Sequence, residues 1–348
     1  MDTFVIIKIF FFTILAFIIA VSWTPILTFF MYKYKLGKRI RDNESAPVMA
    51  SFHEHKAGTP TMGGLLIWVT ALIIAVVFYY LARFTDWEIF DKLNFLTRSQ
   101  TLLPLGALVA AALVGLIDDI FNIKGIGPNG GGLQMRYKLM IYTAIALVGA
   151  FWFYFKLDWD LIRLPFIGDF QIGWWYIPIF VFIIVGASNA VNITDGLDGL
   201  AGGLLASSFA AYGVIAFTQG RYDLATFCGV IVGGLLAFLW FNINPARFFM
   251  GDTGSMSLGV TLGIVAMLTN SVLILPIIGF LFVLETLSVI IQMCSKKFLG
   301  RKVFISAPLH HHLQAMGWPE TKIVMRFWLI ATVMAFIGVI ISLIDKLY

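Results

Sequence analysis

Four short polar stretches interrupt an otherwise apolar chain, and their side chains are of the types that handle phosphates, protons or metal ions. In chain order they are GLIDD with Asp118 and Asp119, NITDGLDGLAGG with Asp195 and Asp198, FNINPARFFMGDTGS with Asn242 and Asp252, and APLHHHL with His310, His311 and His312. A loop that only reverses the chain does not need paired carboxylates. The four stretches therefore predict a reactive site.

The adjacent carboxylates of Asp118 and Asp119 oppose each other's ionisation unless a metal ion or a basic group lies close by. A divalent metal would compensate both charges, and an all-oxygen ligand set suits Mg²⁺ better than Zn²⁺. For a single isolated aspartate, a solvated helix end is an equally good interpretation. For the adjacent pair we favour a magnesium site.

Glycine-rich turns precede three of the apolar segments, in DGLDGLAGG, MGDTGS and GTPTMGG. Glycine lets the backbone approach a ligand closely, and the free N–H groups of a helix N terminus favour anions. Together the three turns predict a ligand rich in phosphate. For GTPTMGG alone, close helix packing through small residues is the alternative.

The three consecutive histidines and Glu285 are polar groups for which the sequence allows more than one role. Side chains of consecutive residues diverge and no cysteine lies near the histidines, so a role with phosphates or protons is favoured over zinc binding. Glu285 lies within the apolar stretch FLFVLETLSVIIQ, where a carboxylate costs roughly 2.5–3.5 kcal/mol at the membrane centre. We expect it to face the helix bundle, as part of a proton path, a structural ion pair or the floor of the site.

Composition indicates an all-α, polytopic membrane protein. Of the 348 residues, 60% are hydrophobic and 12% are charged, and the mean hydropathy is +0.91. Uncharged runs long enough for the ~20 residues of a membrane-crossing helix recur along the chain, which excludes a water-soluble domain. We expect a single integral membrane domain, 1–348. The net charge of +5 is explained by basic residues at membrane borders, so no nucleic-acid partner is expected.

Hydropathy predicts about ten transmembrane helices, with both termini outside. The expected spans are Phe4–Met31, Met62–Leu81, Thr101–Ile117, Leu139–Phe155, Trp174–Val191, Leu200–Thr218, Leu224–Phe241, Gly254–Thr269, Ser271–Met293 and Ile323–Ile344. Most of the 24 lysines and arginines fall in the odd-numbered loops, which the positive-inside rule assigns to the cytoplasm. All four polar stretches fall on that side. Between the fourth and fifth spans, alternation around Gly168–Asp169 predicts a short outer-face β-hairpin.

These motifs, in this order and spacing over nearly the whole chain, resemble the phospho-MurNAc-pentapeptide translocase family of the polyprenyl-phosphate N-acetylhexosamine-1-phosphate transferase superfamily. The resemblance implies ten helices with outer termini and a site on the cytoplasmic face of the bacterial inner membrane. The implied reaction transfers phospho-MurNAc-pentapeptide from UDP-MurNAc-pentapeptide to undecaprenyl phosphate with Mg²⁺, releasing UMP and forming lipid I. The family therefore acts in peptidoglycan synthesis.

The resemblance also implies roles for individual residues. Asp252 is implied as the metal ligand, with Asp118 and Asp119 as the acidic pair beside it. In the mechanism that we expect, Asp118 receives the proton of the lipid phosphate or holds it ready, and Asp119 helps to fix the metal and Lys138. The implied catalytic set is completed by Lys138, His311 and His312, near the phosphates or the acceptor. The implied nucleotide-binding set is Lys56, Asp195, Gly196, Leu197, Asp198, Asn242, Phe249 and Gln292.

Two features of the sequence depart from the family pattern. Gln314 stands where relatives have Glu, which questions an acidic role there, and the loop around Lys56 is longer than usual. A UDP-GlcNAc-dependent transferase of the same superfamily is one alternative function, and an ion-coupled transporter is another. The oligomeric state is also open, with a homodimer among the options.

Overall fold

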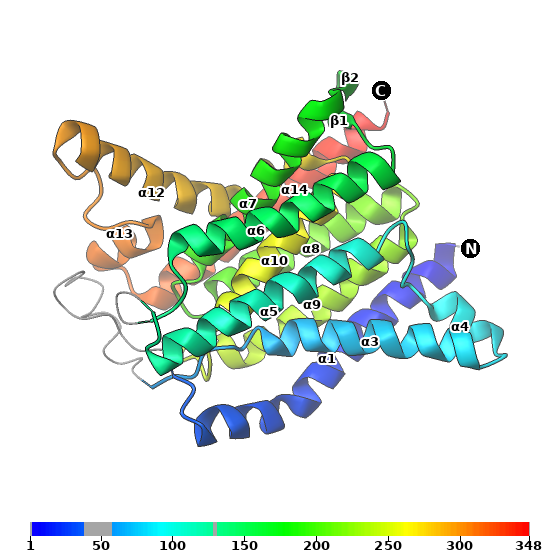
Figure 1. The fold of residues 1–348 in the computed structure, drawn as a ribbon, viewed down its shortest axis with the longest axis horizontal. Coiled ribbons are helices and arrows are strands. Elements are labelled where there is room, and N and C mark those ends of the chain that lie inside the picture. The colour runs from blue at the N-terminus through cyan, green and yellow to red at the C-terminus, as the bar shows by residue number, and fades with distance from the viewer. Residues whose placement is uncertain (1, 38–57, 128–130, 348) are drawn as a thin grey trace.

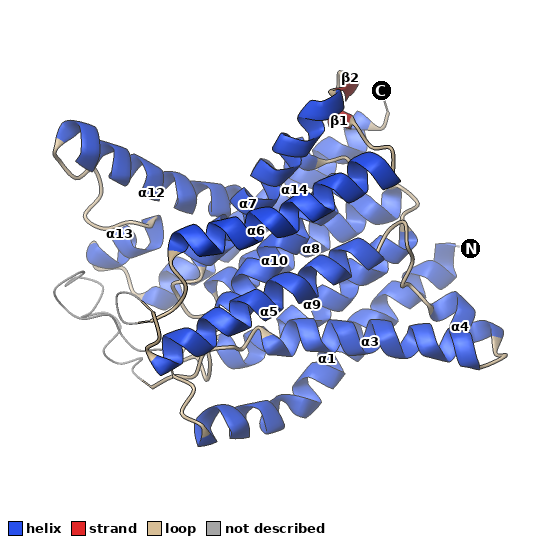
Figure 2. Ribbon diagram, viewed as in Figure 1, coloured by secondary structure: helices blue, strands red, loops and turns tan. Residues whose placement is uncertain are grey.

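The computed structural model describes residues 2–37, 58–127 and 131–347, and these fold into a bundle of long helices (Figures 1 and 2). The helices are α1 (Asp2–Lys33), α3 (Leu65–Phe84), α4 (Glu88–Leu93), α5 (Leu102–Lys124), α6 (Met135–Phe151), η3 (Trp152–Lys156), η4 (Gly173–Trp175), α7 (Tyr176–Thr194), α8 (Leu200–Thr218), α9 (Tyr222–Asn242), α10 (Asp252–Leu268), η5 (Val272–Ile274), α11 (Leu275–Ile278), α12 (Phe280–Leu299), α13 (Leu309–Ala315) and α14 (Glu320–Asp345). The two strands are β1 (Leu161–Leu164) and β2 (Gly168–Gln171).

The predicted spans correspond to helices, and the polytopic fold is confirmed. By length and composition, 8 helices of the described chain can cross a membrane, and a bent pair raises the number to 9. The predicted eighth span corresponds to α10, a shorter helix of 17 residues whose positions are all buried. Helices of the bundle therefore surround α10 on every side.

The ninth predicted span, Ser271–Met293, is wrong as a single straight helix. The chain bends by 82° between Val272–Ile278 and Phe280–Leu299. Pro276 lacks a backbone donor, and Gly279 separates the short α11 from α12. As a result α12 projects away from the bundle (Figure 1), and its exposed end carries Lys296 and Lys297.

Small residues bring α10 into close contact with its neighbours α5 and α7. A Cβ atom on Gly115 of α5 would lie 2.4 Å from the carbonyl oxygen of Asp252, and one on Gly259 of α10 would lie 2.7 Å from that of Ala187. Only glycine fits at such distances. This packing of backbone on backbone, typical of membrane helices, sets where the first turn of α10 lies.

The predicted β-hairpin is confirmed. Strands β1 and β2 pair antiparallel with Leu164 opposite Gly168. The carboxylate of Asp345 at the end of α14 accepts hydrogen bonds from the Arg163 side chain and, at 2.7 Å, from the Phe166 N–H. The hairpin therefore lies beside the C terminus, away from the end of the bundle where α12 and α13 project (Figure 1).

We predict that Gly115→Ala destabilises the protein, because the added methyl group must displace the start of α10. An overpacked core position costs ~1–3 kcal/mol, so the thermal unfolding midpoint in detergent should fall. Gly106→Ala on the same helix is the matched control, since its Cβ would meet nothing within 4 Å. Equal midpoints for the two variants would contradict the close contact between α5 and α10.

Candidate active site

Lys138 joins two of the predicted carboxylates. Its ammonium nitrogen lies 2.6 Å from Asp118 Oδ2 and 2.6 Å from Asp252 Oδ2. The three side chains come from the end of α5 and the starts of α6 and α10, and both aspartates are almost fully buried. The compensating cation that the adjacent aspartates require is thus present in the chain itself.

Asp119 holds the first turn of α10. Its Oδ1 accepts the N–H of Asp252 and its Oδ2 accepts the N–H of Thr253, each at 3.1 Å. The first N–H groups of a helix have no partner within the helix, and a carboxylate there also interacts favourably with the helix dipole. Gly251 precedes the helix with a φ of 73°, and a Cβ there would lie 2.5 Å from Asp119 Oδ2. Glycine is therefore required at this position.

Further hydrogen bonds fix the orientation of the carboxylates. Asn192 of α7 donates to Asp252 Oδ1 at 3.1 Å and to Ser255 Oγ at 2.9 Å. Asp118 accepts from Asn122 at 3.0 Å and from the Leu133 N–H at 2.5 Å. The sequence reasoning did not single out Asn192. Asn192 is the first residue of the NITDGLDGL motif and lies three residues after Asn189, so the two amides are neighbours on one helix face.

The GTPTMGG segment supports the loop before α10 by backbone pairing. The N–H groups of Gly63 and Gly64 donate to the carbonyls of Phe249 and Met250 at 2.7 and 2.8 Å, and the Phe249 N–H donates to Pro60 O at 2.8 Å. A Cβ on Gly64 would lie 2.3 Å from Gly254 Cα. Of the two interpretations of this segment, close packing is the one that the geometry supports, because both N–H groups are in use.

Hydrogen bonds to other segments of the chain fix the conformation of the NITDGLDGL turn. Asp198 donates its N–H to Glu320 Oε1 at 2.6 Å, and its Oδ2 accepts from Asn244 and from the Ala246 N–H at 2.9 and 3.1 Å. The amide of Asn242 accepts the Gly199 N–H at 2.9 Å and donates to Phe248 O at 2.8 Å. Asp198 and Asn242 therefore connect three loops at one end of the bundle, and the N–H groups of Asp198 and Gly199 have partners inside the protein.

Glu285 pairs with the first histidine. Its carboxylate lies 3.0 Å from His310 Nδ1 and accepts the His310 N–H at 3.2 Å, and both side chains are fully buried. A Cβ on Gly196 would lie 2.3 Å from His310 Nε2. Of the three interpretations left open for Glu285, this contact supports a structural pair, which anchors α13 against the turn at Gly196.

The other two histidines use different partners. His311 Nδ1 lies 2.8 Å from Gln314 Oε1, and His312 Nδ1 accepts the Ile305 N–H at 3.2 Å. Gln292 accepts the N–H groups of Val303 and Phe304 at 3.1 and 3.0 Å, so it shapes the loop that leads to α13. Gln314 supplies an uncharged oxygen where a glutamate would supply a charged one, and the contact to His311 needs no acidic group.

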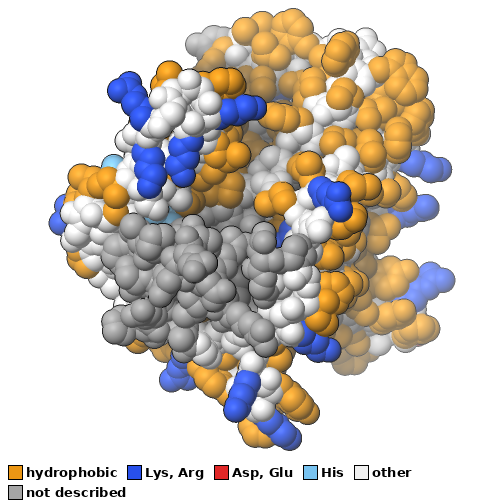
Figure 3. All heavy atoms as spheres, turned by 60° about the vertical axis from the view of Figure 1, so that its left-hand side comes forward, with side chains coloured by type: hydrophobic (Ala, Val, Ile, Leu, Met, Phe, Trp, Pro, Cys, Tyr) orange, Lys and Arg blue, Asp and Glu red, His pale blue; other side chains and the backbone are white. Residues whose placement is uncertain are grey.

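The polar stretches that were predicted to lie on one side of the membrane meet at one end of the bundle. Hydrogen bonds link Asp118, Asp119, Lys138 and Asp252 into one cluster, and link the NITDGLDGL turn to Asn242 and Glu320. Asp195, Gly196, Leu197 and Phe249 lie in these same loops. Lys56 lies outside the described residues. Figure 3, in which this end of the bundle is turned forward, shows separate lysine and arginine side chains around the edge of the view, which suits an anionic ligand.

Comparison with known proteins shows the family of the chain. Residues 101–270 match the model of glycosyl transferase family 4, and residues 56–67 match phospho-N-acetylmuramoyl-pentapeptide-transferase signature 1. A phospho-N-acetylmuramoyl-pentapeptide-transferase of Chloroflexus aggregans is 43% identical over 328 residues, covering 90% of this chain and 84% of the relative. One of Geobacillus thermodenitrificans is 40% identical over 330 residues, covering 94% and 95%. The chain belongs to the phospho-N-acetylmuramoyl-pentapeptide-transferase family.

The two family matches fall on the parts of this transferase that form the cluster. The signature at 56–67 includes the Gly63–Gly64 contact to the loop before α10, and the longer match runs from α5 to the end of α10. Asp118, Asp119, Lys138 and Asp252 all lie within the longer match. The residues that hold the first turn of α10 therefore lie within the segments that the two family models match.

We predict that Lys138→Met lowers the stability of the transferase by about 3–5 kcal/mol, because it leaves two buried carboxylates without their cation. Adding Asp118→Asn should restore part of the loss. Thermal midpoints of the single and double variants in detergent measure both effects. Lys92→Met, which breaks the exposed 2.7 Å pair with Glu88, is the control and should change little. A Lys138→Met protein as stable as the wild type would contradict the compensating role.

Proposed function

We propose that this protein transfers phospho-MurNAc-pentapeptide from UDP-MurNAc-pentapeptide to undecaprenyl phosphate, giving UMP and lipid I. Family membership supports the reaction, and the observation that carries the proposal for the site is the Asp118–Lys138–Asp252 cluster at the converging helix ends. A site at helix ends can meet a soluble nucleotide and a lipid headgroup at the same membrane border. The basic loops favour the cytoplasmic face of the bacterial inner membrane, by the positive-inside rule.

Mg²⁺ is the cofactor that we propose for this site. No group of three or more His, Cys, Asp or Glu side chains placed to hold a metal occurs in the described parts of the chain. Mg²⁺ in phosphoryl-transfer sites is usually held by one or two carboxylates together with substrate phosphates, so the cluster still fits it. Asp252 would hold the ion, with Asp118 or Asp119 beside it. When bound, Mg²⁺ would neutralise charge on the diphosphate and on the departing UMP.

The chain's own residues provide positioning and proton handling. Lys138 fixes Asp118 and Asp252 on either side of one ammonium group, and Asn192 fixes the other oxygen of Asp252. We propose that the lipid phosphate attacks the β-phosphate of the donor directly, since its oxygen is already a competent nucleophile. Asp118 then accepts any proton that this phosphate carries, exchanging one of its present hydrogen bonds. An aspartyl-phosphate intermediate is the two-step alternative.

The nucleotide would be recognised by the loops around the NITDGLDGL turn. We propose that Asp195, Gly196, Leu197 and Phe249, which lie in these loops, belong to the nucleotide site. Asp198, Asn242 and Gln292 already hold neighbouring loops through the hydrogen bonds described above, so they act at least in part by shaping the nucleotide site. His311 and His312, on α13, would serve the phosphates or the acceptor.

The first test is UMP release by purified protein in detergent with undecaprenyl phosphate, comparing UDP-MurNAc-pentapeptide with UDP-GlcNAc. We expect release only with the MurNAc donor, and loss of release on adding a chelator, restored by Mg²⁺. Release with UDP-GlcNAc alone would overturn the donor while keeping the chemistry. No release with either donor from folded protein would favour the ion-coupled transporter.

A second test separates catalysis from binding. We predict that Asp252→Asn lowers Mg²⁺-dependent UMP release by roughly 10²-fold or more, as for loss of a group that stabilises developing charge, while UDP-MurNAc-pentapeptide still binds. Calorimetric titration of the donor and the turnover rate measure the two effects. Asp91→Asn, on the exposed α4, is the control and should turn over at the wild-type rate. Turnover by Asp252→Asn at the wild-type rate would contradict the assignment of Asp252 as the metal ligand.

A further inference from the structure

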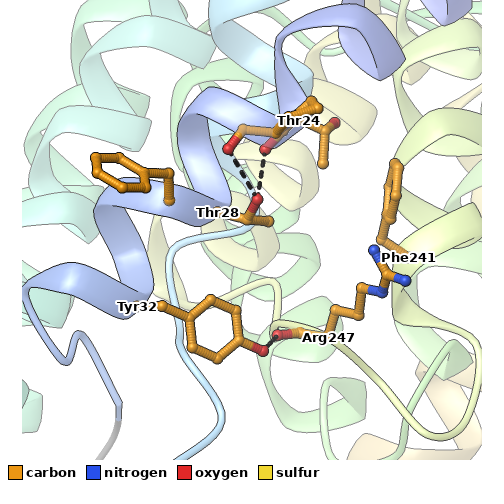
Figure 4. Close-up of a pocket in the computed structure, with 7 residues that line it drawn as sticks. Thr24, Thr28, Tyr32, Phe241 and Arg247 are labelled. Carbon is orange, nitrogen blue, oxygen red and sulfur yellow. Dashed lines mark hydrogen bonds between the residues drawn. The ribbon is translucent and has the colours of Figure 1, made fainter.

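A cavity of about 460 Å³ opens between the second half of α1 and the end of α9 (Figure 4). It is lined by Thr24, Pro25, Thr28, Phe29, Tyr32, Phe241 and Arg247. None of these seven residues belongs to the cluster described above. The walls are mostly aromatic and aliphatic, and Arg247 is the one charged side chain among them.

The other polar groups of the cavity already donate to backbone carbonyls. Thr24 donates to Ala20 O at 2.7 Å, and Thr28 donates to Thr24 O at 2.9 Å. Tyr32 donates its hydroxyl to Arg247 O at 2.9 Å. A ligand in this cavity would therefore find its hydrogen-bond donors on the guanidinium group of Arg247.

The guanidinium group is held in place without a carboxylate partner in the described parts of the chain. It lies over the ring of Phe241, 5.7 Å from the centroid (Figure 4). The backbone that carries it is fixed on both sides, because the Arg247 N–H donates to Phe241 O at 2.8 Å and Tyr32 binds the Arg247 carbonyl. A positioned donor group loses little entropy on binding, and a guanidinium fits a phosphate through two parallel hydrogen bonds.

The surroundings place the cavity at the level of lipid headgroups. Two aromatic side chains of its wall, Phe29 and Tyr32, are also exposed, and α1 ends with Lys33. Aromatic and basic residues gather where a membrane helix leaves the hydrocarbon for the polar interface. The cavity thus offers one cation at the interface and an apolar wall that continues toward the hydrocarbon.

We propose that this cavity binds an anionic glycerophospholipid, with the phosphodiester on Arg247 and an acyl chain along Pro25, Phe29 and Phe241. One guanidinium group matches the single charge of a phosphodiester, whereas a nucleotide diphosphate would need further donors. The apolar wall accounts for a diacyl lipid rather than a free phosphate. The site is separate from the transfer reaction and does not depend on the proposed substrates.

Native mass spectrometry of the purified protein, titrated with phosphatidylglycerol or with phosphatidylcholine of the same chains, tests the proposal. We expect the wild type to bind one phosphatidylglycerol about tenfold more tightly than phosphatidylcholine, and Arg247→Gln to lose that preference. Arg326→Gln is the matched control and should keep it, because Arg326 is also exposed and lies over an aromatic ring, Trp318, but outside the cavity. Thermal midpoints show whether each variant is folded.

A second variant tests the apolar wall with the charge intact. Thr28→Trp fills the cavity and should weaken phosphatidylglycerol binding while Arg247 remains. Undiminished preference for phosphatidylglycerol in folded Arg247→Gln would overturn the proposal. Complete displacement of the lipid by glycerol 3-phosphate would also overturn it, by showing that the phosphate alone is bound. Binding confined to monomers, with lipid-free dimers, would assign this face to a second copy of the chain instead.

Discussion

The site depends on the carboxylate of Asp119, which accepts the first N–H groups of α10 at Asp252 and Thr253. Helix α10 is buried along its whole length, so these N–H groups have no access to water and would otherwise be costly. The same bonds fix the end of α5 to the start of α10. Asp118, one residue before Asp119, is thereby brought to the same ammonium group as Asp252.

The contact between the end of α5 and the start of α10 requires glycine at neighbouring positions, because a side chain would not fit there. Gly115, Gly251 and Gly64 each stand where a Cβ would come within 2.5 Å of an atom of Asp252, Asp119 or Gly254. Close packing at the site thus explains these three glycines. A membrane bundle has little hydrophobic driving force between its helices, so close packing and interhelical hydrogen bonds must hold such a contact together.

Hydropathy predicted the positions of the helices well, because apolar runs between polar borders determine them directly, although 8 or 9 of the described helices can cross a membrane where ten were expected. The hairpin at Gly168–Asp169 was predicted from the alternation of apolar and polar residues, and the gathering of polar loops at one end from the distribution of basic residues. The 82° bend before α12 was not, since Pro276 and Gly279 lie within an unbroken apolar run. The roles of Asn192 and of Glu285 were also missed or left open, because hydropathy does not show which polar groups meet across helices. Asp198 and Asn242 were predicted to bind nucleotide, and only the coordinates show that they bind loop backbone.

The charge balance of the cluster bears on which partners it can accept. The cluster contains three carboxylates and one ammonium group: Lys138 pairs with Asp118 and Asp252, and Asp119 binds the backbone of Asp252. With all four side chains ionised, the cluster is negative by two units. Part of this charge is offset by the α10 N terminus at Asp119. An anionic diphosphate would still be repelled at short range, even though the basic outer loops attract it from a distance. A divalent cation at Asp252, as proposed above, would reduce that repulsion.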